Sequence, residues 1–168
     1  VKKELLRSET NEVCCDKAEL LGVLRMSGAI VIRGMNIGIH FSTENAALAR
    51  RVLQILKNNY QVQTEVVITR SRRLKKNNRY QVRVLPAPQV NIAMTELQLL
   101  SMESDLKNPL LTKQCCKRAF LRGAFLGGGS ISRPSSDYHL EMVTGNEDFA
   151  RSIIKVMHTF SMKAKLTD

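Results

Sequence analysis

The chain has 168 residues, of which 43% are hydrophobic and 24% are charged. This length allows one or two small domains with a buried core, and the composition is that of an ordinary globular protein. No apolar run approaches the roughly 20 residues of a membrane-spanning helix, and no secretory leader opens the chain, so we expect a cytoplasmic protein with no membrane partner.

The net charge of +11 is unevenly distributed. Between residues 50 and 90, ten basic residues and the single acid Glu65 give +9 of that total. A solvated face kept basic for solubility is one explanation, but a concentrated positive face attracts polyanions, which favours a nucleic acid as partner. The basic residues are Arg50, Arg51, Lys57, Arg70, Arg72, Arg73, Lys75, Lys76, Arg79 and Arg83.

Residues 1–27 have helical character, with a predicted break near residues 8–11. Asp16 followed by Glu19 has the spacing of a capping box, which predicts that a helix begins there. Gly28 is expected to end this helix in a left-handed turn.

Two short runs, 29–33 and 37–41, are β-branched or alternating and predict a hairpin around an intervening turn. Ser42 or Thr43 is the predicted N-cap of the next helix, which we expect to stop near Asn58.

Alternation over 61–69 and 80–84 predicts two more strands, joined by a basic hairpin tip over residues 70–79. A helix is predicted over 91–103, and residues 104–111 are expected to form a linker.

After the linker, residues 112–126 predict another helix, with a hairpin from strands 130–133 and 138–143. A further helix is predicted over 146–160, and residues 162–168 are expected to start a third strand.

The stretch Leu20–Gly28 recurs as Leu121–Gly129, at an offset of 101 residues. Matches at the same offset extend beyond both copies, so we interpret the chain as a duplicated unit with repeats 1–103 and 112–168. The second repeat lacks a counterpart of the last strand and helix of the first, so we expect a piece of a longer protein. The matches include Cys14/Cys115, Cys15/Cys116, Ala18/Ala119, Thr43/Thr144 and Asn45/Asn146.

The cysteines form two adjacent pairs, Cys14-Cys15 and Cys115-Cys116. Neighbouring cysteines make a strained disulfide, and zinc sites usually have two residues between ligands. One interpretation is small apolar helix residues that recur because the unit recurs. The other is that the pairs meet across the repeat axis as a metal or redox site.

A nine-residue motif that ends in Gly, occurs twice and is followed by hairpins and helices resembles the LAGLIDADG homing endonuclease fold. The second copy, Lys117 to Ile131, together with Tyr138-His139-Leu140-Glu141, is similar to the WhiA family of bacterial regulators. The resemblance implies an α+β fold of duplicated αββαββ units, related by a pseudo-two-fold axis, with the second repeat truncated.

The resemblance also implies that the two motif helices pack closely at glycines, and that their sheets form a saddle able to straddle a duplex. Enzymes of this fold carry a metal-binding acid at the eighth motif position, which here is Ser27 or Gly128. Neither supplies a charged oxygen, so we expect no nuclease activity, no cofactor and no metal at that site. The packing glycines are Gly22, Gly28, Gly123 and Gly129.

The leading hypothesis is a non-catalytic, nucleoid-associated DNA-binding domain of a regulator of sporulation or cell division. Its partners would be double-stranded DNA, its own helix-turn-helix region outside this chain, and a further regulator protein. The alternative is a protein-interaction or self-association scaffold with no DNA contact. The predicted phosphate contacts are Arg70, Arg72, Arg73, Lys75, Lys76 and Arg79, with Arg33 and Arg83 on neighbouring strands.

Overall fold

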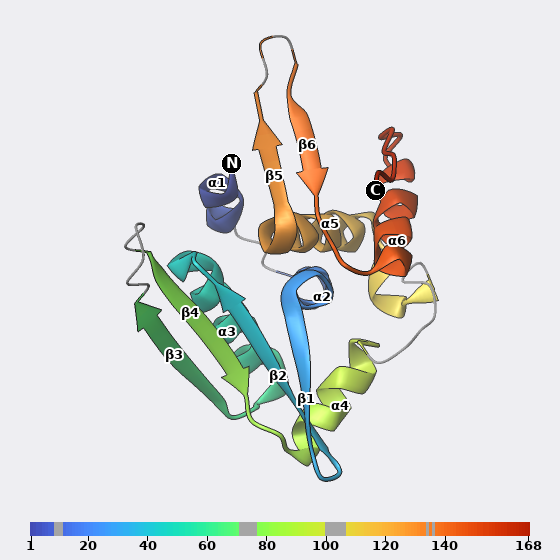
Figure 1. Ribbon diagram of the computed structural model, residues 1–168. Coiled ribbons are helices and arrows are strands. Elements are labelled where there is room, and N and C mark those ends of the chain that lie inside the picture. Colours follow the sequence, from blue (N-terminus) through green and yellow to red (C-terminus); the bar gives the residue numbers. More distant parts are fainter. Residues whose placement is uncertain (9–11, 71–76, 100–106, 134, 136) are drawn as a thin grey trace. The chain divides into compact units, whose positions relative to one another are not determined.

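The computed structural model describes residues 1–8, 12–70, 77–99, 107–133, 135 and 137–168 (Figure 1). The chain divides into two compact units. The sheet unit comprises residues 2–9 and 27–100, and the helix unit comprises Val1 with residues 10–26 and 101–168. This division differs from the division by repeat, because nearly all of the first motif helix packs with the second half of the chain.

The sheet unit is built on a four-stranded antiparallel sheet of order β1-β2-β4-β3. Its strands are β1 (Gly28–Arg33), β2 (Asn36–Thr43), β3 (Thr64–Arg70) and β4 (Asn78–Val84). Ile39 lies opposite Val84 and Phe41 opposite Val82, and all four side chains are buried. These residues alternate with polar ones along β2 and β4, so one face of the sheet forms the core and the other stays accessible.

Helices α3 (Ala46–Tyr60) and α4 (Pro88–Glu96) cover the buried face of the sheet (Figure 1). The amide of Ile37 donates to Asn91 Oδ1 at 2.9 Å, which fixes α4 against the β1–β2 turn. The short helix α1 (Lys2–Arg7) packs on α3, where Arg51 donates to the carbonyl oxygen of Leu6 at 3.2 Å.

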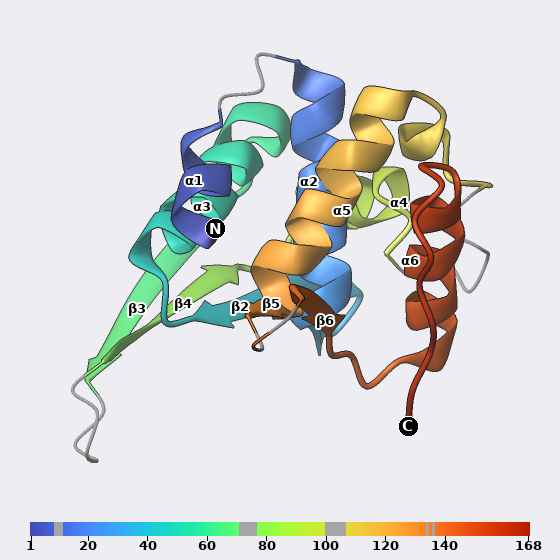
Figure 2. The same cartoon turned by 90° about the horizontal axis from the view of Figure 1, so that it is seen from above.

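The helix unit is organised around α2 (Val13–Ser27) and α5 (Gln114–Gly128), which lie side by side (Figure 2). A 3₁₀ turn, η2 (Pro109–Leu111), precedes α5, and a two-stranded hairpin follows it, made by β5 (Gly129–Ser132) and β6 (His139–Met142). Helix α6 (Glu147–His158) packs against α5, where the rings of Phe120 and Phe149 meet edge to face with centroids 5.9 Å apart.

The structure corrects several predicted helix ends. Helix α2 begins at Val13, so Asp16 lies inside the first turn and the predicted capping box is wrong. Gly28 does not take a left-handed turn, because β1 begins at Gly28 itself, in register with Phe41. The N-cap of α3 is Asn45, since its side chain accepts hydrogen bonds from the first turn.

Two predicted segments also differ. Helix α4 spans Pro88–Glu96 rather than 91–103, and positions 100–103 lie outside the described residues. Residues 162–168 form no strand, and this segment is not paired with either edge of the two-stranded sheet β5-β6. None of the helices in the described ranges combines the length and the apolarity that crossing a lipid bilayer requires.

Candidate nucleic-acid interface

The face of the four-stranded sheet that points away from α3 and α4 carries most of its polar side chains; we call it the open face. Side chains alternate between the two faces along each strand, and residues directly opposite each other on paired strands share a face. Starting from Arg83, these two rules identify the residues of the open face. The open-face residues with hydrogen-bonding or charged side chains include Arg33, His40, Ser42, Glu65, Thr69, Arg79, Gln81 and Arg83.

Arg83 stands at the centre of the open face. It lies opposite His40 on β2 and opposite Glu65 on β3. Its Nε donates to Gln81 Oε1 at 2.7 Å, which orients the guanidinium along β4. The remaining guanidinium N–H groups provide a planar set of donors, which suits phosphate oxygens or the base edge of guanine.

The structure distributes the predicted phosphate contacts over several places. Arg79 and Arg83 lie on the open face of β4, whereas alternation puts Arg70 on the side of the sheet that carries Ile68. Arg33 ends β1, which β2 separates from β4, so it is not on a strand next to the basic hairpin, contrary to the prediction. Four predicted contacts, Arg72, Arg73, Lys75 and Lys76, lie outside the described residues.

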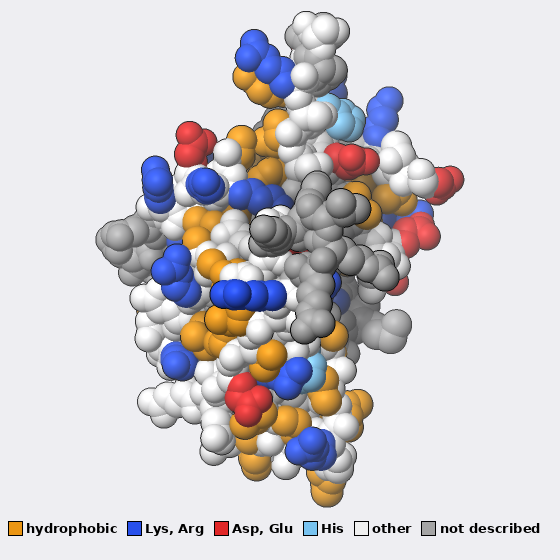
Figure 3. Space-filling view, turned by 60° about the vertical axis from the view of Figure 1, so that its left-hand side comes forward, with side chains coloured by type: hydrophobic (Ala, Val, Ile, Leu, Met, Phe, Trp, Pro, Cys, Tyr) orange, Lys and Arg blue, Asp and Glu red, His pale blue; other side chains and the backbone are white. Residues whose placement is uncertain are grey.

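Figure 3 shows one side of the molecule in space-filling form. Lys and Arg side chains are spread over this side among hydrophobic ones, and acidic side chains are fewer. This distribution agrees with the excess of basic residues in the sequence.

The motif helices α2 and α5 cross where both backbones carry glycine. A Cβ at Gly22 would lie 2.8 Å from the amide nitrogen of Ala124, and closer still to the carbonyl oxygen of Phe120. A Cβ at Gly123 would lie 2.9 Å from the carbonyl carbon of Glu19. Backbone atoms occupy both positions, so this spacing of the helices requires residues without a Cβ.

The other two predicted packing glycines are placed differently. A Cβ at Gly129 would meet the ring of Phe125, a residue of the same repeat. Gly28 begins β1 opposite Phe41 and belongs to the sheet unit.

Sequence reasoning missed an ion pair between the motif helices. Arg122 Nε donates to Glu19 Oε1 at 2.6 Å, and the Glu19 side chain is 1% exposed. The sequence predicts a local capping role for Glu19, because a carboxylate three residues after Asp16 fits a capping box. The missed signal is an acid within an otherwise apolar helix stretch, which a buried position tolerates only with a partner.

The positions that carry acids in enzymes of this fold end the two motif helices. Ser27 is the last residue of α2, and Gly128 is the last residue of α5. A Cβ at Gly128 would lie 2.6 Å from Cγ and 2.7 Å from Sδ of Met26, so a methionine side chain fills the space beside the missing acid.

The second hairpin offers polar groups that sequence reasoning also overlooked. Arg133 directly follows β5, and its guanidinium lies over the ring of Tyr138, 5.6 Å from the centroid. Tyr138 is 74% exposed, so a cation and an aromatic ring lie together on the surface. The available signal was that Arg133 ends one predicted strand of this hairpin and Tyr138 begins the other.

Comparisons with known proteins bear on both halves of the chain. Residues 13–100 match the family described as WhiA N-terminal LAGLIDADG-like domain, and residues 117–168 match the WhiA LAGLIDADG-like domain. Among curated relatives, the chain is 40% identical over 171 residues to the probable cell division protein WhiA of Oceanobacillus iheyensis, covering 99% of this chain and 54% of the relative. The corresponding protein of Bacillus cytotoxicus is 41% identical over 169 residues, covering 98% of this chain and 52% of the relative.

The solved structures agree on the fold. A crystal structure of a WhiA N-terminal LAGLIDADG domain aligns with a TM-score of 0.70 and 23% identity, over 99% of this chain and 76% of that one. The homing endonuclease I-DmoI, solved in complex with DNA and Mn, aligns with a TM-score of 0.58 and 14% identity, over 88% of this chain and 78% of that one. The predicted α+β, LAGLIDADG homing-endonuclease-like fold is therefore confirmed.

Proposed function

The chain belongs to the family of the WhiA N-terminal LAGLIDADG-like domain, and from that premise we propose that it is a non-catalytic, DNA-associated domain of a bacterial cell-division regulator. The observation that carries the proposal is the open face of the sheet, with Arg33, Arg79 and Arg83. The sequence adds the basic stretch 70–79 between β3 and β4. Cationic side chains there neutralise phosphates and position a duplex without specifying its sequence.

The proposal excludes strand cleavage. Hydrolysis by the related enzymes needs carboxylates at the ends of the motif helices to hold divalent metal ions. Ser27 and Gly128 stand at those ends, and neither side chain carries a charge. Incubation of supercoiled plasmid with the protein and Mg²⁺ is expected to leave the plasmid intact, and nicked or linear product above the protein-free rate would contradict this.

Base-specific recognition is assigned to a region outside these residues. The chain spans about half the length of the curated relatives it matches. In this proposal a helix-turn-helix region of the same protein selects the site, and the protein associates with the nucleoid and controls sporulation or cell-division genes. The two repeats, 1–103 and 112–168 with linker 104–111, contribute affinity for the DNA backbone.

The test is a titration of the full-length protein with duplex DNA at two salt concentrations. Affinity should fall steeply with salt, since a protein with six to ten phosphate contacts loses about 10³- to 10⁵-fold between 50 and 200 mM salt. A variant that reverses four charges of the basic hairpin should lose most of this dependence. Its substitutions are Arg72→Glu, Arg73→Glu, Lys75→Glu and Lys76→Glu.

The matched control makes the same change in net charge elsewhere. It reverses four exposed lysines of the helix unit. If both variants lose affinity equally, only net charge matters and the basic hairpin is not the contact with DNA; if the hairpin variant binds like the unmodified protein, the proposal fails. The control substitutions are Lys107→Glu, Lys113→Glu, Lys163→Glu and Lys165→Glu.

One observation favours the alternative, a protein-interaction scaffold. Around the β1–β2 turn, Ile32 is 72% exposed, Met35 is 94% exposed and Ile92 on α4 is 70% exposed. Exposed apolar side chains that gather in one place mark interaction surfaces. Substituting Ile32 and Met35 by Ser should leave DNA affinity unchanged under the main proposal, while loss of a co-purifying partner or of self-association would support the scaffold.

A further inference from the structure

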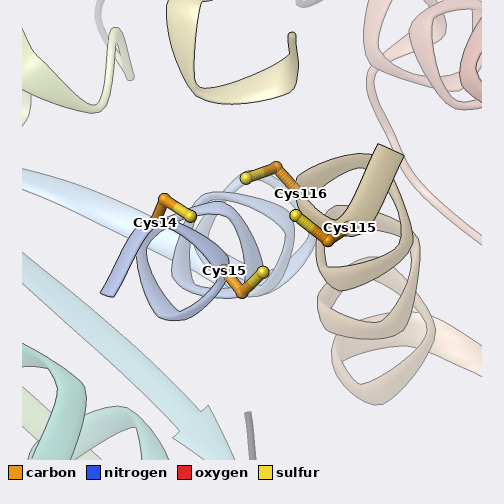
Figure 4. Close-up of side chains that lie close together, drawn as sticks. All are labelled: Cys14, Cys15, Cys115 and Cys116. Carbon is orange, nitrogen blue, oxygen red and sulfur yellow. The ribbon is translucent and has the colours of Figure 1, made fainter. Parts of the chain in front are cut away.

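The four cysteines of the chain come together at one end of the motif helices. The sulfur atoms of Cys14, Cys15, Cys115 and Cys116 all lie within 4.8 Å of one another. Figure 4 shows the four side chains pointing toward a common centre between α2 and α5. All four residues belong to the helix unit.

The convergence follows from the repeat and from the close helix crossing. Each pair occupies the second and third positions of its helix, α2 or α5. Neighbouring residues on a helix project about 100° apart, so two adjacent cysteines can reach one point from two directions. The approach of the backbones at Gly22 and Gly123 brings the two helices near enough for both pairs to meet.

We propose that Cys14, Cys15, Cys115 and Cys116 form a tetrathiolate site for Zn²⁺ that ties the two motif helices together. A tetrahedral zinc site has Zn–S distances of about 2.3 Å, which sets the sulfurs roughly 3.8 Å apart. The sulfurs therefore need to move together by about 1 Å, a displacement within reach of small side-chain rotations.

The surroundings suit a metal bound by thiolates. Both pairs lie in the first turn of a helix, where the helix dipole favours negative charge. When Zn²⁺ binds, four thiols lose their protons to solvent, and four Zn–S bonds form to give a centre of net charge −2. Cys115 is exposed, which provides a path for the ion, whereas Cys15 and Cys116 are buried.

Burial favours the protonated form of two thiols of the cluster, those of Cys15 and Cys116. Burial, together with the nearby Cys115 thiol, raises the pKa of Cys15 to about 12. Burial, together with the nearby Cys14 thiol, also raises the pKa of Cys116. The thiols of Cys14 and Cys115 donate to the carboxylate of Glu12 at 3.5 and 3.9 Å. Glu12 therefore accepts from the two less buried members of the cluster.

Two other roles account for the cluster less well. Packing explains the buried Cys15 and Cys116 but not Cys14, which is half-buried, or the exposed Cys115. A disulfide within a pair is strained, and the structure has all four cysteines as free thiols rather than in disulfides between the helices. A tetrahedral metal uses all four.

The experiment uses the full-length protein, reduced and stripped of metal, titrated with Co²⁺ as a coloured substitute for Zn²⁺. The expected result is saturation at one ion per chain, with the visible bands of tetrahedral cobalt, near-ultraviolet thiolate charge-transfer bands, and displacement by Zn²⁺. The double variant Cys14→Ser/Cys115→Ser should lose the bands. It should bind the ion at least 10- to 100-fold more weakly, because removing only an outer-shell partner of a metal ligand already causes a loss of that size.

The matched control is Val13→Ser/Gln114→Ser, which makes the same kind of substitution at the exposed residues next to each pair. It should bind the ion unchanged. If the cysteine variant fails to fold, alkylation of the unmodified protein decides: bound Zn²⁺ should protect all four thiols together. Protection of fewer thiols, absence of binding at one equivalent, or a disulfide in place of the metal overturns the proposal.

Discussion

Gly22 and Gly123 determine how closely the two motif helices approach. In an exposed helix, Gly→Ala stabilises by roughly 0.5–1 kcal/mol, because alanine loses less backbone entropy on folding. Here the added methyl group would meet the carbonyl oxygens of Phe120 and Glu19, which are backbone atoms that cannot rotate away. The steric clash therefore outweighs the gain in backbone entropy, and alanine at either position is expected to lower stability.

We expect Gly22→Ala and Gly123→Ala each to lower the free energy of unfolding by about 1–3 kcal/mol, the usual cost of overpacking. Urea unfolding followed by circular dichroism measures the change. Gly145→Ala is the matched control, because its Cβ would have no neighbour within 4 Å. Equal effects at the three positions would show that the helices do not need this close contact.

The Glu19–Arg122 pair gives a second prediction at the residue scale. Because Glu19 is 1% exposed and Arg122 is 15% exposed, removing either partner takes the paired counter-charge away from a buried group. We expect Glu19→Leu or Arg122→Leu to cost about 3–5 kcal/mol of unfolding free energy, while the double variant recovers most of that loss. A double-mutant cycle in urea measures the coupling, and additive losses would contradict it.

Among the secondary-structure elements, the two repeats share one way of starting a helix. The side-chain oxygen of Asn45 accepts from the backbone amides of Ala47 and Leu48 at 3.0 and 3.3 Å. The backbone amide of Asn45 donates to Thr43 Oγ1. In the second repeat, Asn146 accepts from the amide of Phe149 at 2.9 Å, and its amide donates to Thr144 Oγ1. The identity of these positions in both repeats therefore has a physical cause.

Replacing either cap by alanine should cost about 1 kcal/mol of unfolding free energy, because two helix amides at Asn45 and one at Asn146 lose an acceptor. Asn45→Asp and Asn146→Asp keep the accepting oxygen and are expected to change stability little. Thermal unfolding of the four variants tests this. A loss with Asp as large as with Ala would mean that the side-chain oxygen is not the stabilising group.

Much at this scale was predictable from the sequence, because the repeat and local patterns encode helices and hairpins directly. The predictions fail where a residue distant in sequence determines the local structure. Glu19 has capping-box spacing, but it forms an ion pair with Arg122 instead. Gly28 has the sequence features of a helix stop, but it pairs with Phe41 and is the first residue of β1. The sequence left two interpretations of the cysteine pairs open, because only the distance between the helices distinguishes apolar packing from a shared metal or redox site.

For the whole molecule, the repeats of the sequence and the compact units of the structure are different divisions. Residues 10–26 leave the first repeat and pack with residues 101–168. Two contacts lie inside the helix unit but join the two repeats. Gly22 contacts the backbone of Phe120 and Ala124, and Glu19 pairs with Arg122. A cut at the linker therefore separates the repeats and divides one hydrophobic core.

We accordingly expect the fragment 112–168 to lack a cooperative thermal transition when produced alone. Its helices α5 and α6 retain the contact between Phe120 and Phe149, but α5 loses the apolar face of α2 on its other side. Fewer than about 70–80 residues rarely form a sufficient core without a metal or disulfide. Co-production with 1–103 should restore the transition and yield a one-to-one complex on gel filtration. Cooperative unfolding of 112–168 by itself would show instead that the second repeat is stable without α2, and that the close helix crossing is an accessory contact rather than part of the core.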